Sequence, residues 1–179
     1  MKNCQYRQSV PTSASERLGG FTLAEVMLVI VILAIAAMLA LPLATSGAST
    51  QLKSAATIIA SDLEYAKSMA ISRGRNYSVV FNTGAESYQI EDANGVLIKH
   101  PVKKSWYTVN FATDSRLNQV DISSADFGDT SETVGFDYLG SPYNGSGDPL
   151  NSGVVTLRTG SSTMTVNVEP VTGYITISD

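Results

Sequence analysis

Few side chains of this 179-residue chain could carry out covalent or metal chemistry. Cys4 is the only cysteine and His100 the only histidine, so the sequence contains no intrachain disulfide, no Cys/His zinc site and no Cys-His dyad. Any Ser-His-Asp triad would need His100, which precedes Pro101 at the end of an expected strand and is predicted to lie in a loop. We therefore expect no enzyme, no cofactor and no metal site.

Glu25 is the single ionisable residue within an apolar run of 23 residues, positions 21–43. An acidic side chain costs roughly 2.5 to 3.5 kcal/mol near the centre of a membrane helix, which makes it a candidate functional residue. A shallow position that reaches the headgroups, or simple protonation, would explain Glu25 equally well on sequence position alone.

The other charged residues suggest weaker hypotheses. Six acidic residues could supply oxygen ligands to calcium, but their spacing does not follow an EF-hand, and we expect a solvated acidic loop. After residue 20 the chain carries nine basic and fifteen acidic residues, which disfavours DNA as a partner. The six acidic residues are Asp121, Asp126, Asp129, Glu132, Asp137 and Asp148.

The run at 21–43 is long enough to cross a bilayer as a helix. Basic residues precede it and none follows until Lys53, which predicts a cytoplasmic N-terminus and a C-terminal domain on the far side of the membrane. The competing interpretation is a secreted β-domain with an ordinary signal peptide that is cut near residues 44–48. The apolar core of such a peptide has about 7 to 15 residues, which favours a retained membrane helix.

Residues 44–74 read as an amphipathic continuation of this helix, because apolar residues recur every three or four positions. Pro42 should kink the helix, and Gly74 should end it. The apolar stripe consists of Leu52, Ala56, Ile59, Leu63, Ala66 and Ala70.

Residues 75–179 contain short β-branched or alternating runs separated by turn residues, which predicts an antiparallel β-domain and an α+β fold. We expect a loop at residues 139–153 and a turn at 170–173, where Pro170 fixes its φ angle and Gly173 is free to adopt a positive one. The predicted strands are 77–82, 87–91, 96–99, 106–111, 134–138, 154–158, 163–168 and 174–177.

The GFTLAE motif at residues 20–25 resembles the type III signal sequence of type IV pilins and type II secretion pseudopilins. In that family a membrane prepilin peptidase cuts after the glycine, and the new N-terminal residue is methylated. The resemblance implies cleavage between Gly20 and Phe21, N-methylation of Phe21, and pairing of Glu25 with the free amine of a neighbouring subunit.

Two further motifs, FDYLGSP at 136–142 and VNVEPVTGYI at 166–175, are similar to the closing motifs of the GspH/FimT minor pilins and pseudopilins. AKSMAISRGR at 66–75 resembles the end of the long helix of that family. These resemblances imply a pilin-like fold, in which a long kinked helix packs on a small antiparallel sheet, and partners among other major and minor pilins or pseudopilins. Some members bind DNA through a basic C-terminal strand, but residues 172–179 contain no arginine or lysine here.

The resulting hypothesis is a minor pilin that primes or caps a type IV pilus, with an H-type minor pseudopilin of a type II secretion system as the alternative. A DNA-uptake receptor is the least favoured. The expected organisation is a leader at 1–20, a membrane and filament-core helix at 21–43, its amphipathic continuation at 44–74 and a periplasmic β-domain at 75–179. The protein should lie in the inner membrane before it enters the filament.

Processing is directly testable. We predict removal of 20 residues, which leaves a mature chain of 159 residues that begins at methylated Phe21, and intact-mass analysis of membrane-purified protein measures this. Gly20→Ala should leave uncut precursor in the membrane. A mature N-terminus beyond residue 43 would contradict the hypothesis.

Overall fold

The structure is a computed structural model that describes residues 20–129 and 131–179, without the side chains of residues 39–46. The expected leader therefore lies outside the described residues except for Gly20. The chain divides into two units, Met1–Leu41 and Pro42–Asp179; we call the second unit the head. Helix α1, Leu23–Arg73, contributes residues to both units.

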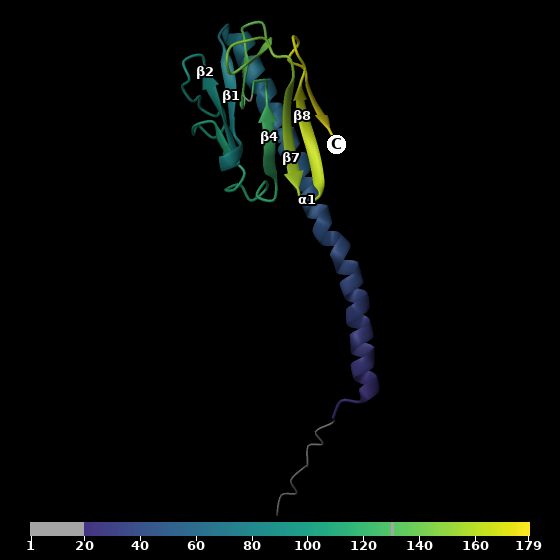
Figure 1. The fold of residues 1–179 in the computed structure, drawn as a ribbon. Coiled ribbons are helices and arrows are strands. Elements are labelled where there is room, and N and C mark those ends of the chain that lie inside the picture. The colour runs from purple at the N-terminus through teal and green to yellow at the C-terminus, as the bar shows by residue number, and fades with distance from the viewer. Residues whose placement is uncertain (1–19, 130) are drawn as a thin grey trace, which may run out of the picture. The chain divides into compact units, whose positions relative to one another are not determined.

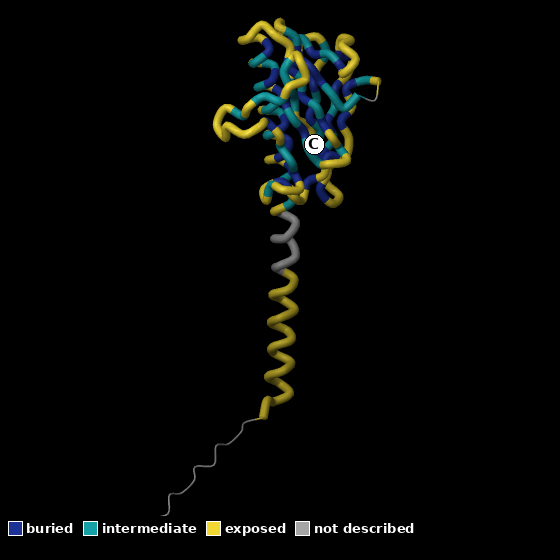
Figure 2. The backbone as a smooth tube through the Cα atoms, turned by 90° about the vertical axis from the view of Figure 1, so that its left-hand side faces the viewer, coloured by how far each residue is buried: buried dark blue, intermediate teal, exposed yellow. Residues whose placement is uncertain are grey.

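In the first unit, every described side chain from Gly20 to residue 38 is exposed, as the yellow tube in Figure 2 shows. These side chains are apolar except for Thr22 and Glu25, so this part of α1 has no polar face. Within the part of the chain that the structure describes, no helix is both long enough and apolar enough to cross a membrane. Pro42 and the end of the predicted span lie among the residues whose side chains are not described, and the kink stays a prediction.

The head contains two antiparallel sheets, whereas the sequence suggested one (Figure 1). The five-stranded sheet has the order β3-β2-β1-β5-β6, and the four-stranded sheet has the order β4-β7-β8-β9. A short 3-10 helix, Thr83–Ala85, joins β1 to β2. The strands are β1 Tyr77–Asn82, β2 Ser87–Asp92, β3 Thr108–Asn110, β4 Asp121–Asp126, β5 Thr133–Phe136, β6 Pro142–Asn144, β7 Gly153–Thr159, β8 Ser162–Val168 and β9 Ile175–Ser178.

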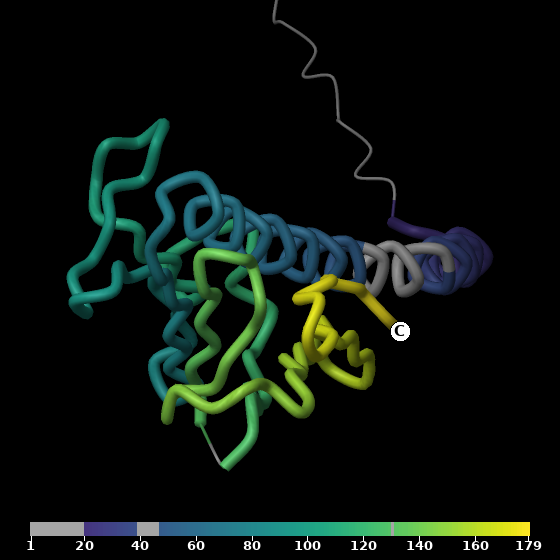
Figure 3. Tube along the Cα trace, turned by 90° about the horizontal axis from the view of Figure 1, so that it is seen from above, coloured from purple at the N-terminus to yellow at the C-terminus, as the bar shows by residue number. Residues whose placement is uncertain are grey.

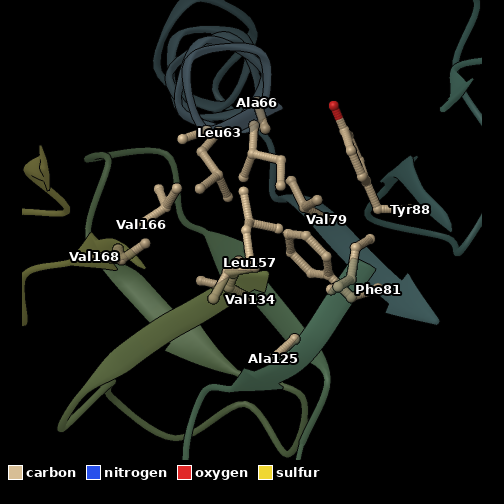
Figure 4. Packing of buried hydrophobic residues seen from close by; sticks show 14 of the residues in the cluster. Leu63, Ala66, Val79, Phe81, Tyr88, Ala125, Val134, Leu157, Val166 and Val168 are labelled. Carbon is tan, nitrogen blue, oxygen red and sulfur yellow. The ribbon is translucent and has the colours of Figure 1, made fainter. Parts of the chain in front are cut away.

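The predicted stripe on α1 is confirmed, since all six of its residues are buried. In Figure 4, Leu63 and Ala66 point from the helix toward the inner faces of the sheets. Their neighbours include Val79 of β1 and Leu157 of β7, which belong to different sheets. The helix therefore closes one core that both sheets share.

Strand β4 was not predicted, because its sequence, DISSAD, does not alternate. The structure explains this irregularity by a bulge: Ile122 pairs with Leu157 and Ser124 pairs with Thr156, so one residue of β4 has no partner. The buried residues Ile122 and Ala125 are consequently three positions apart rather than two.

The predicted loop at 139–153 is wrong in part, because it contains β6. Pro142 is compatible with this strand since β6 lies at the edge of its sheet, where a missing N–H is tolerated. The expected strand at 96–99 is wrong, since these residues form no strand, and the one expected at 106–111 is shorter, because β3 covers only Thr108–Asn110. Only isolated bridges, Glu91 to Leu97 and Lys99 to Trp106, precede β3.

The shared core makes one prediction about stability. Leu63 is fully buried, so Leu63→Ala should lower the free energy of unfolding of the full chain by about 2 to 5 kcal/mol, measured by chemical denaturation in detergent. Ile71→Ala is a control on the same helix, since Ile71 is 51% exposed, and it should cost far less. Equal losses for the two variants would contradict the packing described here.

Candidate functional site

The N-terminus of α1 begins with a helix cap directly after the expected cleavage position. The Thr22 hydroxyl oxygen accepts a hydrogen bond from the Glu25 backbone N–H at 3.2 Å. The T-x-x-E spacing is that of a capping box, a signal that sequence reasoning could have used and missed. Phe21, which precedes the cap, is 83% exposed, and there is open space around Gly20.

Glu25 lies in the first turn of α1, where the partial positive charge of the helix N-terminus favours a carboxylate. It lines a shallow apolar hollow with Phe21, Val26 and Val29. The cap and the helix dipole give Glu25 a local role that does not need a neighbouring subunit. The described unit therefore places Gly20, Phe21 and Glu25 together at one exposed helix start.

The two closing motifs contact one another over the C-terminal end of α1. A Cβ atom on Gly173 would lie 2.8 Å from the backbone oxygen of Gly140, and one on Gly140 would lie 2.9 Å from the Cδ1 atom of Ile71. Lys67 donates to the Gly173 carbonyl oxygen at 2.9 Å. Glycine at both positions thus permits the close approach of two loops and a helix.

The turn between β8 and β9 contains Pro170 and Gly173. Gly173 has φ 58°, and Val171 has φ 65°, which is unusual for a β-branched residue. The Thr172 N–H donates to the Pro170 carbonyl oxygen at 2.6 Å, and the Gly173 N–H donates to that of Glu169 at 3.0 Å. These two bonds close the turn between β8 and β9.

Asp62 joins α1 to strand β2 and to Tyr107, the residue that precedes β3, at one edge of the five-stranded sheet. The Tyr88 hydroxyl donates to Asp62 Oδ2 at 2.6 Å, and the Tyr107 hydroxyl donates to Oδ1 at 2.8 Å. The Tyr107 ring also stacks between two other rings, with centroids 5.5 Å from Tyr65 and 4.6 Å from His100. Sequence reasoning missed this constellation, because the three bonded residues lie far apart along the chain.

Burial raises the pKa of the Asp62 carboxyl, although the two tyrosine hydroxyls and the positive charge of Lys103 oppose this effect. Burial also raises the pKa values of Tyr88 and Tyr107, with Asp62 adding to both. Both hydroxyls are therefore donors throughout the neutral range. The network therefore stabilises the contact between α1 and the sheet and does not serve proton transfer.

A polar cavity of about 510 Å³ lies beside this network and is lined by residues that include Asp62, His100, Lys103, Asp114 and Arg116. Arg116 donates to Asp114 through Nε and Nη2 at 3.0 and 2.6 Å, which lowers the pKa of that carboxyl to about 2. The walls of the cavity thus carry charges of both signs. Within residues 20–129 and 131–179, no group of three or more Cys, His, Asp or Glu side chains is placed to hold a metal ion.

Comparisons with known proteins identify the family. The family model described as type II transport protein GspH matches residues 55–172, well over half of the chain. The chain belongs to this GspH family. The expectation of a minor pilin or pseudopilin of the GspH/FimT kind is confirmed.

Solved structures add the fold. The minor pseudopilin EpsH from the type 2 secretion system of Vibrio cholerae aligns with a TM-score of 0.53 and 10% identity, over 72% of this chain and 96% of that one. The type IV minor pilin FimU of Pseudomonas aeruginosa aligns with a TM-score of 0.49 and 16% identity, over 73% and 90%. A search of curated proteins gave no match. The EpsH alignment confirms the α+β, pilin-like fold expected from the sequence.

Membership of the GspH family implies a structural component of a pilus or pseudopilus that assembles with other pilins or pseudopilins. The match covers residues 55–172 and therefore includes the buried stripe from Ala56 onward, strands β1 to β8, the first closing motif and residues 166–172 of the second. Gly20, Phe21 and Glu25 lie outside the matched residues.

The raised pKa of Asp62 predicts a pH dependence. The native state holds this proton more tightly than the unfolded state, so the contribution of Asp62 to stability falls as the pH rises from about 3.8 through the raised value. Asp62→Asn removes this fall. The free energy of unfolding of Asp62→Asn minus that of the unaltered chain should therefore increase as the pH rises from 3.5 to 7.

Tyr88→Phe serves as the control, since it keeps the carboxyl but removes one of its donors and should steepen the decline with pH. Urea denaturation at several pH values measures all three proteins. A pH-independent difference between Asp62→Asn and the unaltered chain would show that the carboxyl is not perturbed as described.

Proposed function

We propose that this GspH-family chain is a minor pilin that enters a type IV pilus and helps to prime or cap it. The observation that carries the proposal is the first unit, in which apolar side chains are exposed on every side of the described helix from Leu23 to residue 38. A helix without a polar face needs an apolar environment, which a bilayer or a bundle of similar helices supplies.

The proposal includes both environments in sequence. Before assembly the helix holds the chain in the inner membrane, with Lys2, Arg7 and Arg17 on the cytoplasmic side and the head in the periplasm. The prepilin peptidase then cuts between Gly20 and Phe21 and methylates Phe21. The exposed, open backbone at these two residues suits access by another protein.

Glu25 is the proposed assembly residue. Cleavage after Gly20 creates a positively charged amine on Phe21 of every subunit, and a carboxylate in an apolar bundle needs such a partner. The Thr22 cap fixes the backbone of Glu25 within the first helical turn. Each subunit thus carries an amine and a carboxylate within five residues, so neighbouring subunits can pair in series.

A minor pseudopilin of a type II secretion system is the second candidate. The description of the matching family model, a type II transport protein, favours it. The two candidates share the processing, the helix and the Glu25 role, and they differ in the filament that the chain enters. Deletion of the gene should abolish surface pili in the first case and protein secretion in the second.

Glu25→Ala tests the assembly role. The variant should still be inserted and cut, since it removes only a desolvation cost, but its recovery with partner pilins from detergent-solubilised membranes should fall by about tenfold or more. The head should unfold as before, because the shared core contains no residue of the first unit.

Two controls separate the charge from the helix cap. Glu25→Asp keeps the charge and should retain part of the recovery, whereas Thr22→Ala removes the cap hydroxyl but leaves the carboxylate and should assemble. If Glu25→Ala is recovered with partners as well as the unaltered chain, the carboxylate serves the helix start and not assembly.

A further inference from the structure

We propose that a projecting loop of the head docks, head to tail, on the acidic end of a second copy of this chain. The loop comprises residues 93–106, between β2 and β3, and we call it the arm. In Figure 3 the arm leaves the body of the head as part of the teal-green trace. The proposal adds a partner surface to the assembly role and rests on that proposed function.

The arm is held in a defined conformation. The His100 N–H donates to the Ser105 carbonyl oxygen at 2.8 Å, and the Lys104 N–H donates to that of His100 at 3.0 Å. His100 Nδ1 accepts the backbone N–H groups of Val102 and Lys103 at 3.1 and 3.2 Å. Because the His100 ring stacks on Tyr107, which bonds Asp62, the arm is anchored to α1.

The arm combines positive charge with exposed apolar surface. It holds Lys99, Lys103 and Lys104, and no acidic residue occurs from 93 to 113. Val102 is 81% exposed and Trp106 is 56% exposed, with Lys99 Nζ 5.8 Å from the Trp106 ring centroid. Exposed lysines beside large apolar side chains on an ordered loop are typical of a docking element rather than of a solvated loop.

The opposite charge lies at the other end of the five-stranded sheet. Residues 117–157 contain six acidic and no basic residues. Exposed Asp126, Asp129 and Asp148 define the acidic end. Asn144 connects two of them, since its N–H donates to the Asp148 carbonyl oxygen at 2.8 Å and its Nδ2 donates to Asp129 Oδ2 at 3.4 Å.

Strand register separates the arm from the acidic end. The arm follows Asp92, which pairs with Tyr77 at the start of β1, and it bridges back to β2 at Glu91. The acidic end lies beyond Asn82 and Thr133, at the other end of β1 and β5. An arm cannot reach the acidic end of its own head, but a second copy stacked along the sheet would present one.

A second copy fits better than a polyanion. DNA or an anionic membrane would meet an overall excess of six acidic residues after residue 20, which repels it at long range. Two copies present unlike charges at their facing ends. Such a contact is heterologous, so each copy contributes a different surface and the pair leaves one arm and one acidic end free.

Charge reversal in the full chain tests the proposal. Two differently tagged copies are co-expressed and recovered from detergent-solubilised membranes at low salt. Lys99→Glu with Lys104→Glu in both copies should lower their co-purification by about three- to tenfold, and so should Asp126→Lys with Asp148→Lys. Co-expression of one copy that carries the arm variant with one copy that carries the acidic-end variant should restore co-purification. The reversed arm of the first copy then faces the reversed end of the second, and the two charges are again opposite.

Lys53→Glu with Arg73→Glu is the matched control, since it reverses two exposed basic residues on α1 outside the arm and should have no effect. Co-purification that neither double variant lowers, or that the mixed pair does not restore, would overturn the proposal. The proposal would also be overturned if the arm variant lost binding to DNA or to phosphatidylglycerol vesicles while co-purification stayed unchanged. If Glu25→Ala abolishes recovery with partners while the arm variants do not, the proposed function stands and this contact fails.

Discussion

The head depends on one constraint, the packing of the α1 stripe against two sheets at once. The stripe combines small and large residues: Ala56, Ala66 and Ala70 let the sheets approach the helix closely, while Ile59 and Leu63 fill the space between them. Removal of the helix would therefore expose both inner faces, which is why the head cannot be treated as a β-domain with a tether.

The same helix presents two different surfaces. In the head its apolar residues form one stripe, whereas from Leu23 to residue 38 they occupy every side. The stripe packs within the subunit. The helix with apolar residues on every side has no partner within the described part of the subunit. The Thr22 cap and Glu25 lie where the second pattern begins, so the only described polar groups of that unit are gathered at its start.

The periodic spacing of apolar residues made much of the fold predictable. The features that depend on contacts between distant residues, or on local irregularities, could not be predicted. The helical stripe, β1, β7 and β8 follow from spacing and turn residues, and the pairing of Thr159 with Ser162 shows that β7 and β8 form a hairpin. Strand β4 was missed because a bulge interrupts its alternation, and β6 because Pro142 suggests a loop. The Asp62 network was not predictable, since nothing local indicates that Tyr88 and Tyr107 meet on one carboxylate.

The central claim is that other pilin helices surround the first unit in the cell. A photo-crosslinking amino acid at Val29, which is 48% exposed on that helix, measures this directly when illuminated in living cells. The account predicts covalent adducts with the N-terminal helix of another pilin or pseudopilin, which mass spectrometry of the linked peptides identifies. Adducts with lipid alone, in cells that assemble filaments, would contradict it.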